Sequence, residues 1–274
     1  MGQKLIGLLK KFFRKFIKCK MNEHPNIQKE DWRLQAITTL TKEWTSPFTG
    51  LKHPVGTPVI AISTIKFDQK LLSLKLPNTT ALFLDFSYKL WQETQNILEN
   101  KIFLDTKSKN VPNNTIYPKN DDDFFNLIEK RMAYIVFSYS ALESFANENI
   151  PDNYILEVTR NDGKCTEKYN KEQIEKWLSL DIKLGEILPQ IMNVSSPKGG
   201  PLWNKYSTIK QLRDRIIHMK SADRKSSGPE EESIWKDILN KMNPNFALEA
   251  KDIIRYYLTD NFKIPRWFNK FPYS

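Results

Sequence analysis

The segment RDRIIHMK, from Arg213 to Lys220, combines a fixed positive charge with a group that titrates near neutral pH. Its His218 is one of 3 histidines in the 274-residue chain and follows Arg213 by five positions. An imidazole can exchange a proton near pH 7, and a guanidinium can hold a phosphate through two parallel hydrogen bonds. The pair therefore suits acid–base chemistry beside a phosphate. The plainer interpretation is an exposed histidine and a salt-bridged arginine.

A helix predicted over about 203 to 221 carries this segment. Its predicted core stripe consists of Ile209, Leu212, Ile216 and Ile217. Arg213 lies on the flank of that stripe, near the core, and needs an anion. Asp214 and His218, four residues apart, share a face turned away from the core.

A second helix, predicted over 121 to 147, supplies a candidate for that anion. Three aspartates open it, and apolar residues cover nearly every face of its second half, so it is expected to be the central buried helix. Glu143 lies in this stretch, where an unpaired carboxylate is costly. Either Glu143 points to solvent with Ser140 and Asn147, or these residues face a cleft shared with another helix, where Glu143 can meet Arg213.

The rest of the chain predicts a mainly α protein. Further helices are expected at about 79 to 101, 170 to 189, 230 to 241 and 246 to 259, so a helical bundle spans 79 to 262. Asn-Asp-Gly between two β-type runs predicts a hairpin insertion at about 154 to 169. Residues 21 to 78 form a small amino-terminal lobe, α/β or irregular, residues 107 to 120 a loop, and residues 263 to 274 a tail.

Residues 1 to 20 form a separate element, a basic amphipathic helix. Their apolar residues fill one half of a helical wheel, and they contain seven lysines and arginines and no acidic residue. Such a helix can lie in an anionic membrane interface or grip an acidic partner. It can equally pack its apolar stripe on the protein's own core.

Composition restricts the class of protein further. A net charge of +10 suits a polyanionic partner, but seven of these charges lie in the first twenty residues, so the body is only mildly basic. The two cysteines lack metal or redox spacing, and no stretch reaches the length of a membrane span. We expect a cytoplasmic protein, peripheral at the membrane if the first helix binds lipid.

The phrase RDRIIH resembles the motif of the HEPN superfamily, in which arginine, a polar residue and three further positions precede a histidine. The preceding helix with FSYSALESFANE is similar to the arrangement in that family. The resemblance covers about residues 79 to 260. It implies a HEPN-like bundle that acts as a homodimer and cleaves RNA without a metal or cofactor, often as a toxin or antiviral-defence effector restrained by a neutralising partner.

The resemblance also implies roles for individual residues. His218 manages proton transfer during attack of the RNA 2′-hydroxyl, Arg213 holds the phosphate, and Asp214 orients the imidazole. Glu143 and Asn147 are supporting residues, inferred from the cost of burial. The flanking basic residues are candidates for RNA binding, with solvated surface as the alternative: Lys210, Arg215 and Lys220.

Two other functions fit the same residues. Some members of the superfamily are non-catalytic modules that bind nucleotides or proteins, and in such a module the motif is not a cleavage site. A membrane-associated protein governed by its first twenty residues is the other alternative, and it is compatible with either activity.

Overall fold

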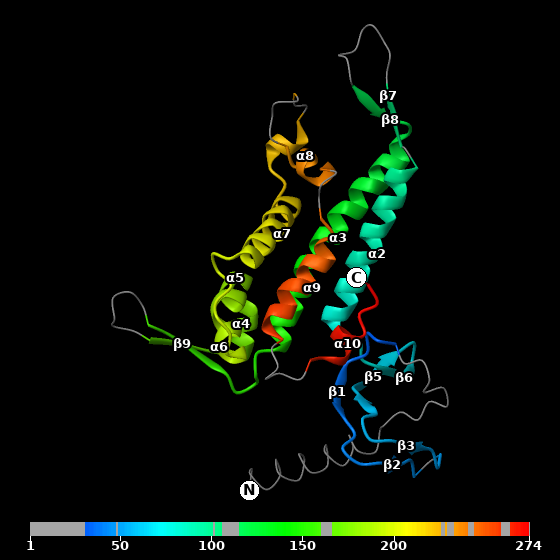
Figure 1. The fold of residues 1–274 in the computed structure, drawn as a ribbon, viewed down its shortest axis with the longest axis vertical. Helices are drawn as coiled ribbons and strands as arrows, with labels where there is room; N and C mark the ends of the chain where they lie inside the picture. The colour runs from blue at the N-terminus through cyan, green and yellow to red at the C-terminus, as the bar shows by residue number, and fades with distance from the viewer. Residues whose placement is uncertain are drawn as a thin grey trace. The chain divides into compact units, whose positions relative to one another are not determined.

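The computed structural model describes residues 31–47, 49–100, 102–105, 115–159, 166–225, 228, 233–240, 244–258 and 264–273. The amphipathic helix predicted at 1 to 20 lies outside these ranges. The chain divides into two compact units, one of residues 1–78 and 265–272 and the other of residues 79–264 and 273–274. The described residues are mainly α-helical, with small antiparallel sheets (Figure 1).

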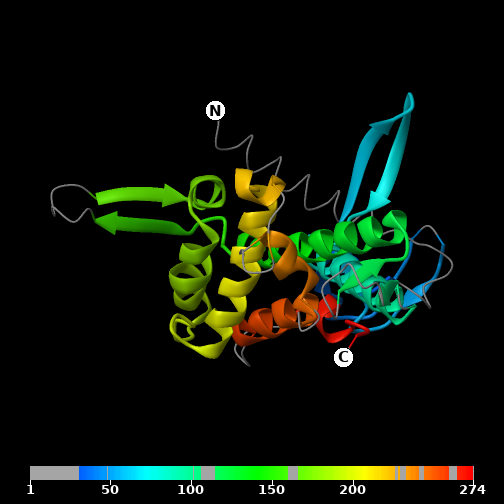
Figure 2. The ribbon, with the colours of Figure 1, turned by 90° about the horizontal axis from the view of Figure 1, so that it is seen from above.

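The larger unit is built around α3 (Asp121–Glu148). This helix packs against α2 (Thr79–Glu99), α7 (Pro201–Ile217), α8 (Ile234–Leu239) and α9 (Phe246–Tyr257), as Figures 1 and 2 show. Its second half is buried on most faces, which confirms the prediction of a central helix. The core between the helices contains aromatic as well as aliphatic side chains, including Tyr134, Phe145 and Phe246.

Local signals explain where α3 begins. The Asn120 side chain accepts a hydrogen bond from the backbone N–H of Asp123 at 2.7 Å, which caps the first turn. Three aspartates in that turn favour the positive end of the helix dipole. The capped start and the apolar second half together fix the helix that presents Tyr139, Glu143 and Asn147.

The segment between α3 and α7 is more divided than predicted. After the antiparallel strands β9 (Ile155–Thr159) and β10 (Thr166–Asn170), the chain forms α4 (Lys171–Trp177), α5 (Leu180–Ile182), a π-helical turn (Lys183–Ile187) and α6 (Leu188–Met192). The expected single helix at 170 to 189 is wrong because Leu178 is extended and the Ser179 side chain caps a new helix.

A small strand pair replaces part of the loop predicted between α2 and α3. Strand β7 (Phe103–Asp105) pairs antiparallel with β8 (Ile116–Pro118). These strands are short β-type runs, at the ends of two helices that pack side by side. The packing of α2 against α3 brings the two runs within pairing distance. The sequence of either run therefore does not predict that they pair.

The smaller unit consists mainly of paired strands rather than an α/β lobe. Strand β1 (Ala36–Thr39) pairs with β4 (Pro58–Ile60), β2 (Trp44–Thr45) with β3 (Lys52–His53), and β5 (Ile62–Phe67) with β6 (Lys70–Lys75). The predicted tail contributes α10 (Arg266–Asn269) to this unit.

Two contacts hold the carboxyl-terminal segment in the smaller unit. The rings of Trp32 and Phe271 meet edge to face with centroids 5.5 Å apart. Arg266 donates a hydrogen bond to the carbonyl of Asp31 at 2.9 Å. Residues 265 to 272 therefore belong to the fold of this unit and are not a free tail.

Across the ranges that the structure describes, none of the helices is both long enough and apolar enough to cross a membrane.

Candidate active site at the end of α7

Helix α7 places the motif at its carboxyl-terminal end. Four residues face the core, namely Tyr206, Ile209, Leu212 and Ile216. Ile217, predicted as the fourth member of the stripe, is 54% exposed because the helix ends at this residue, and the buried Tyr206 was not predicted. His218 follows as the C-cap with φ −116° and ψ 53°, and its backbone N–H donates to the carbonyl of Asp214 at 2.9 Å.

Arg213 is held on the face of an aromatic ring. Its Cζ atom lies 3.8 Å from the centroid of the buried Tyr139 ring, in cation–π geometry. Its Nη1 atom donates to Oδ1 of Asp214 at 2.7 Å. The side chain remains 25% exposed, so the guanidinium is fixed from two sides and still reaches solvent.

The anion beside Arg213 differs from the predicted one. In the described part of the chain its ion pair is with Asp214, not with Glu143. Glu143 lies one helical turn from Tyr139 and raises the pKa of that phenol, as burial does to a larger extent. The Arg213 charge acts in the opposite direction on the same pKa. Glu143 therefore belongs to the electrostatic surroundings of Arg213 without contacting it.

The Glu143 side chain on α3 is only partly buried. Because water can still solvate the carboxylate, it does not need a cationic partner. Ser140, the third polar residue of the predicted cleft, donates from Oγ to the carbonyl of Val136 in its own helix at 3.0 Å. Among the described residues, Asn147 is the one of these three that forms a hydrogen bond to a neighbouring element.

That neighbour is Lys183, the first residue of the π-helical turn. Its side chain is fully buried, and Nζ donates to Oδ1 of Asn147 and to the carbonyl of Glu175, both at 2.9 Å. Burial lowers the pKa of Lys183, and the negative charges of Glu143 and Glu175 oppose this shift. Lys183 is a polar link between α3 and α4 that the sequence analysis missed.

A third polar group connects α5 to α7. Asp181 accepts hydrogen bonds from the buried Tyr206 hydroxyl and from Nζ of Lys210. Burial alone would raise the pKa of Asp181, but these two hydrogen bonds outweigh it and lower the pKa below its ordinary value. A hydrogen bond to Tyr139 also contributes to the raised pKa of Tyr206. The Asp181 group therefore adjoins the ring that supports Arg213.

The three residues predicted to bind RNA have different environments. Lys210 is bound to Asp181, and Arg215 pairs with Asp237 at 2.6 Å and with the buried Asp223 at 3.1 Å. Asp223 also accepts the backbone N–H of Ile234, so Arg215 helps to tie α7 to α8. Lys220 is exposed.

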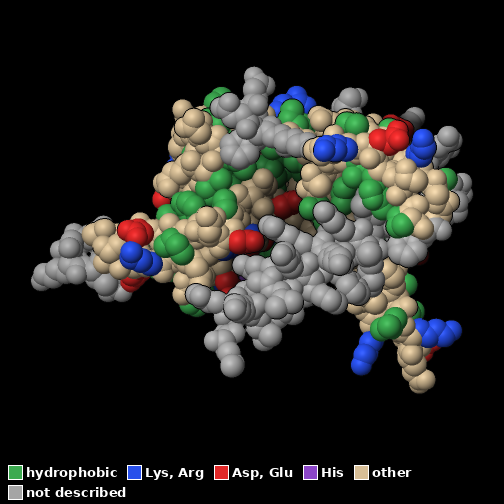
Figure 3. Space-filling view, turned by 90° about the horizontal axis from the view of Figure 1, so that it is seen from below, with side chains coloured by type: hydrophobic (Ala, Val, Ile, Leu, Met, Phe, Trp, Pro, Cys, Tyr) green, Lys and Arg blue, Asp and Glu red, His purple; other side chains and the backbone are tan. Residues whose placement is uncertain are grey.

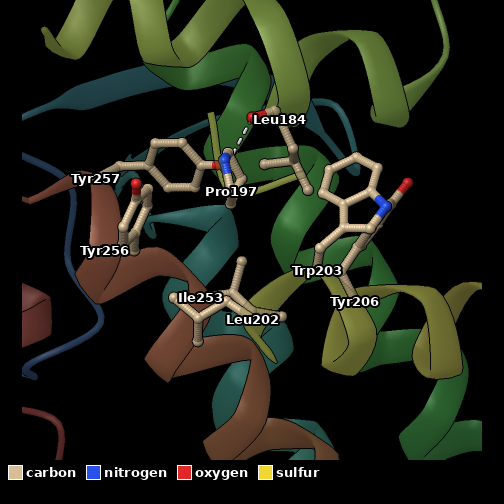
Figure 4. Close-up of a pocket in the computed structure, with 8 residues that line it drawn as sticks. All are labelled: Leu184, Pro197, Leu202, Trp203, Tyr206, Ile253, Tyr256 and Tyr257. Atoms are coloured by element: carbon tan, nitrogen blue, oxygen red, sulfur yellow. Dashed lines mark hydrogen bonds between the residues drawn. The ribbon is translucent and has the colours of Figure 1, made fainter. Parts of the chain in front are cut away.

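His218 is exposed at the helix end. Its side chain forms no hydrogen bond with another described residue, and the Asp214 carboxylate that was expected to orient the imidazole is engaged by Arg213. Figure 4 shows an apolar crevice elsewhere in the bundle, beside the first turns of α7, where the Tyr257 hydroxyl donates to the carbonyl of Leu184 at 2.7 Å. The crevice is too narrow to admit a water molecule, so it is not a ligand pocket.

Within the described ranges, no group of three or more His, Cys, Asp or Glu side chains is placed to hold a metal ion. Comparisons with protein-family models, curated proteins and solved structures found no match to this chain. The candidate site is therefore described from the contacts of its residues alone. Tyr139 is a residue of this site that the sequence analysis did not predict. The signal in the sequence is its spacing, because Tyr139, Glu143 and Asn147 recur every four residues along one helix face.

Proposed function

We propose that this protein is a metal-independent endoribonuclease of the HEPN type. One observation carries the proposal: Arg213 is fixed between the Tyr139 ring and Asp214, yet remains partly exposed, and the exposed His218 ends the same helix. A prepositioned guanidinium stabilises charge on phosphate oxygens without first having to be ordered. The mainly helical fold and the RDRIIH phrase also agree with the HEPN resemblance.

The proposed reaction needs a general base, a general acid and a phosphate clamp. The RNA 2′-oxygen attacks the adjacent phosphorus and gives up its proton, and the bond from phosphorus to the 5′-oxygen breaks as that oxygen takes up a proton. The products are a 2′,3′-cyclic phosphate and a 5′-hydroxyl end. His218 exchanges the proton, because an imidazole can both accept and donate one near neutral pH. Arg213 binds the phosphate oxygens as negative charge builds on them.

A homodimer explains how one exposed histidine per chain can serve both proton transfers. In the HEPN arrangement two motifs share a cleft, so one His218 can act as base while the second acts as acid. Asp214 then serves to hold Arg213 rather than the imidazole. A phosphate entering the site would share or replace this carboxylate as the partner of the guanidinium.

The test is cleavage of total RNA by the full-length protein in EDTA. We expect wild type to cut RNA, and His218→Ala and Arg213→Ala to lose about 100-fold or more of the rate while remaining folded and dimeric. Arg224→Ala, which removes another exposed arginine just after the motif, is the matched control and is expected to cut normally. Equal cleavage by all four proteins would contradict the proposal.

Product chemistry provides an independent test. The proposed reaction leaves 2′,3′-cyclic phosphate ends, which resist phosphatase until acid opens the ring. Linear 3′-phosphate ends formed from the start, or 5′-phosphate ends, would exclude attack by the 2′-hydroxyl. Expression in cells should slow growth for wild type and not for His218→Ala, as expected of a toxin or defence effector.

The second candidate is a non-catalytic module that binds nucleotides or a protein. The ion pairs of Lys210 and Arg215 favour it, because these cations are already neutralised within the chain and offer little to an RNA backbone. This candidate predicts no cleavage by dimeric wild type, together with nucleotide binding that Arg213→Ala weakens.

A further inference from the structure

The strand pair β5–β6 of the smaller unit has an exposed apolar face. Its register places Ile65 opposite Leu72 and Phe67 opposite Lys70. Because side chains alternate between the faces of a strand, one face gathers Ile65, Phe67, Leu72 and Leu74. Phe67 is 64% exposed, Ile65 44% and Leu72 42%. A solvated hairpin would present polar residues here, so this face is suited to an apolar surrounding.

The hairpin is a preformed projection. Figure 2 shows it extending beyond the other strands of its unit. The turn consists of Asp68 and Gln69, which both have positive φ, 44° and 60°. Two such residues make the tight connection that matches the twist of paired strands. Phe67 and Lys70 are thereby held side by side at the tip, and no ordering of a loop is needed when they bind.

The charge of the hairpin indicates the chemistry of its partner. Residues 62 to 75 contain three lysines and one aspartate. Lys66 and Lys70 flank the turn and are exposed, and Leu71 beside them is 74% exposed. Figure 3 shows lysine and apolar side chains together on this projection. Apolar residues next to lysines are complementary to the interface of an anionic bilayer, where negatively charged headgroups cover an apolar layer of acyl chains.

The same charges disfavour a second copy of the chain as the partner. Two hairpins that paired edge to edge would bring the lysines of both copies together, and like charges on paired strands are destabilising. Lysine on an edge strand is a common device against such pairing. In the sequence ahead of the described strands, residues 1 to 20 contain seven basic and no acidic residues.

We propose that the β5–β6 hairpin docks the smaller unit on anionic lipid surfaces. Phe67 and the apolar residues on its face, Ile65 and Leu72, enter the headgroup region, while Lys66 and Lys70 beside the turn contact lipid phosphates. The hairpin belongs to the smaller unit and the RDRIIH motif to the larger one, and the proposal does not depend on ribonuclease activity.

The test is co-sedimentation of full-length protein with vesicles of phosphatidylcholine alone or mixed with phosphatidylserine. We expect wild type to bind the mixed vesicles, and Phe67→Ser to lose about tenfold in affinity because its apolar contact is removed. The double variant Lys66→Glu, Lys70→Glu is expected to lose at least as much, and added salt should weaken binding by wild type. Phe125→Ser, which replaces another phenylalanine that is 56% exposed, is the matched control and should bind as wild type.

Circular dichroism and size-exclusion chromatography of each variant show whether it is folded and whether its oligomeric state has changed. Failure of wild type to bind mixed vesicles would overturn the proposal. Unchanged binding by folded Phe67→Ser and the double lysine variant would also overturn it and leave residues 1 to 20 as the source of any binding. A hairpin variant that loses dimerisation but still binds vesicles would identify the face as a protein interface instead.

Discussion

Two cations contact the polar side of α3, and their surroundings differ. Arg213 lies over Tyr139 and pairs with a partly exposed carboxylate, and its own side chain is 25% exposed. Lys183 contacts Asn147, about two turns further along α3 than Tyr139, and is fully buried between this neutral amide and a backbone carbonyl. The first cation can exchange its partner for a ligand, whereas the second has no access to one. Exposure, more than charge, distinguishes a candidate catalytic cation from a structural one.

The largest effect is expected from Arg213→Lys, which keeps the charge but removes the planar fork. A lysine cannot form two parallel hydrogen bonds to a phosphate and stacks less well on Tyr139. We expect RNA cleavage to fall about 100-fold, measured on a labelled oligonucleotide under single-turnover conditions. Arg224→Lys serves as the control. Normal cleavage by Arg213→Lys would mean that the arginine supplies charge alone.

Replacement of the second cation should affect stability instead. Lys183→Ala leaves a cavity and two unpaired acceptors, on Asn147 and Glu175, so we expect the free energy of unfolding to fall by about 3 kcal/mol. Lys183→Met retains most of the stem and should lose less. Urea unfolding measures both. Cleavage per folded molecule is expected to remain near wild type, and a large loss of rate without a loss of stability would give Lys183 a catalytic role.

Replacing the ring beneath Arg213 should have an intermediate effect on activity. Tyr139→Ala removes the cation–π contact, worth about 1 kcal/mol or more when partly buried, and leaves the guanidinium less fixed. We expect a roughly tenfold loss of cleavage rate beyond any loss of folded protein. Tyr139→Phe keeps the ring face and should restore most of the rate. If both substitutions reduced the rate equally, the hydroxyl rather than the ring would be required.

The smallest effect is expected at high pH. Burial above all, and the hydrogen bond to Asp181, raise the pKa of Tyr206 above its ordinary value near 10. A pKa that is higher in the folded state stabilises the fold below the unfolded pKa, and this contribution is lost as pH rises towards the folded value. The free energy of unfolding should therefore decline above about pH 10, by at most about 1.4 kcal/mol per pH unit for this group.

Tyr206→Phe should make that decline shallower, since it removes one of the tyrosines that titrate only after unfolding. Burial also raises the pKa of Tyr134 to about 12, so part of the decline should remain. Urea titrations of both proteins between neutral and alkaline pH measure the difference. Identical slopes would show that Tyr206 does not contribute to the pH dependence.

The predictions from sequence succeeded where the residues that determine a helix or hairpin all lie within that segment. Helix α3 follows from its three aspartates and its apolar second half, and the hairpin β9–β10 follows from Asn-Asp-Gly between β-type runs. The stripe of α7 was correct except at Ile217, which depends on where the helix ends. In α2 the buried face includes Ser87, whose Oγ lies 2.7 Å from Oγ of Ser138, while Phe86 is 48% exposed. Hydrophobicity alone therefore does not identify every residue on the buried face of that helix, although Leu84 and Leu90 are buried there.

The sequence by itself determined helices α2, α3, α7, α8 and α9, the position of Arg213 and His218 towards the end of α7, and the basic character of the first twenty residues. Only the tertiary structure decided which partner each charge meets. Asp214 forms an ion pair with Arg213, and Asp181 forms one with Lys210. Asn147 accepts a hydrogen bond from Lys183. The physical reason is that helical periodicity fixes the direction of a side chain within its own element, whereas an ion pair depends on the distance and burial that packing between elements sets.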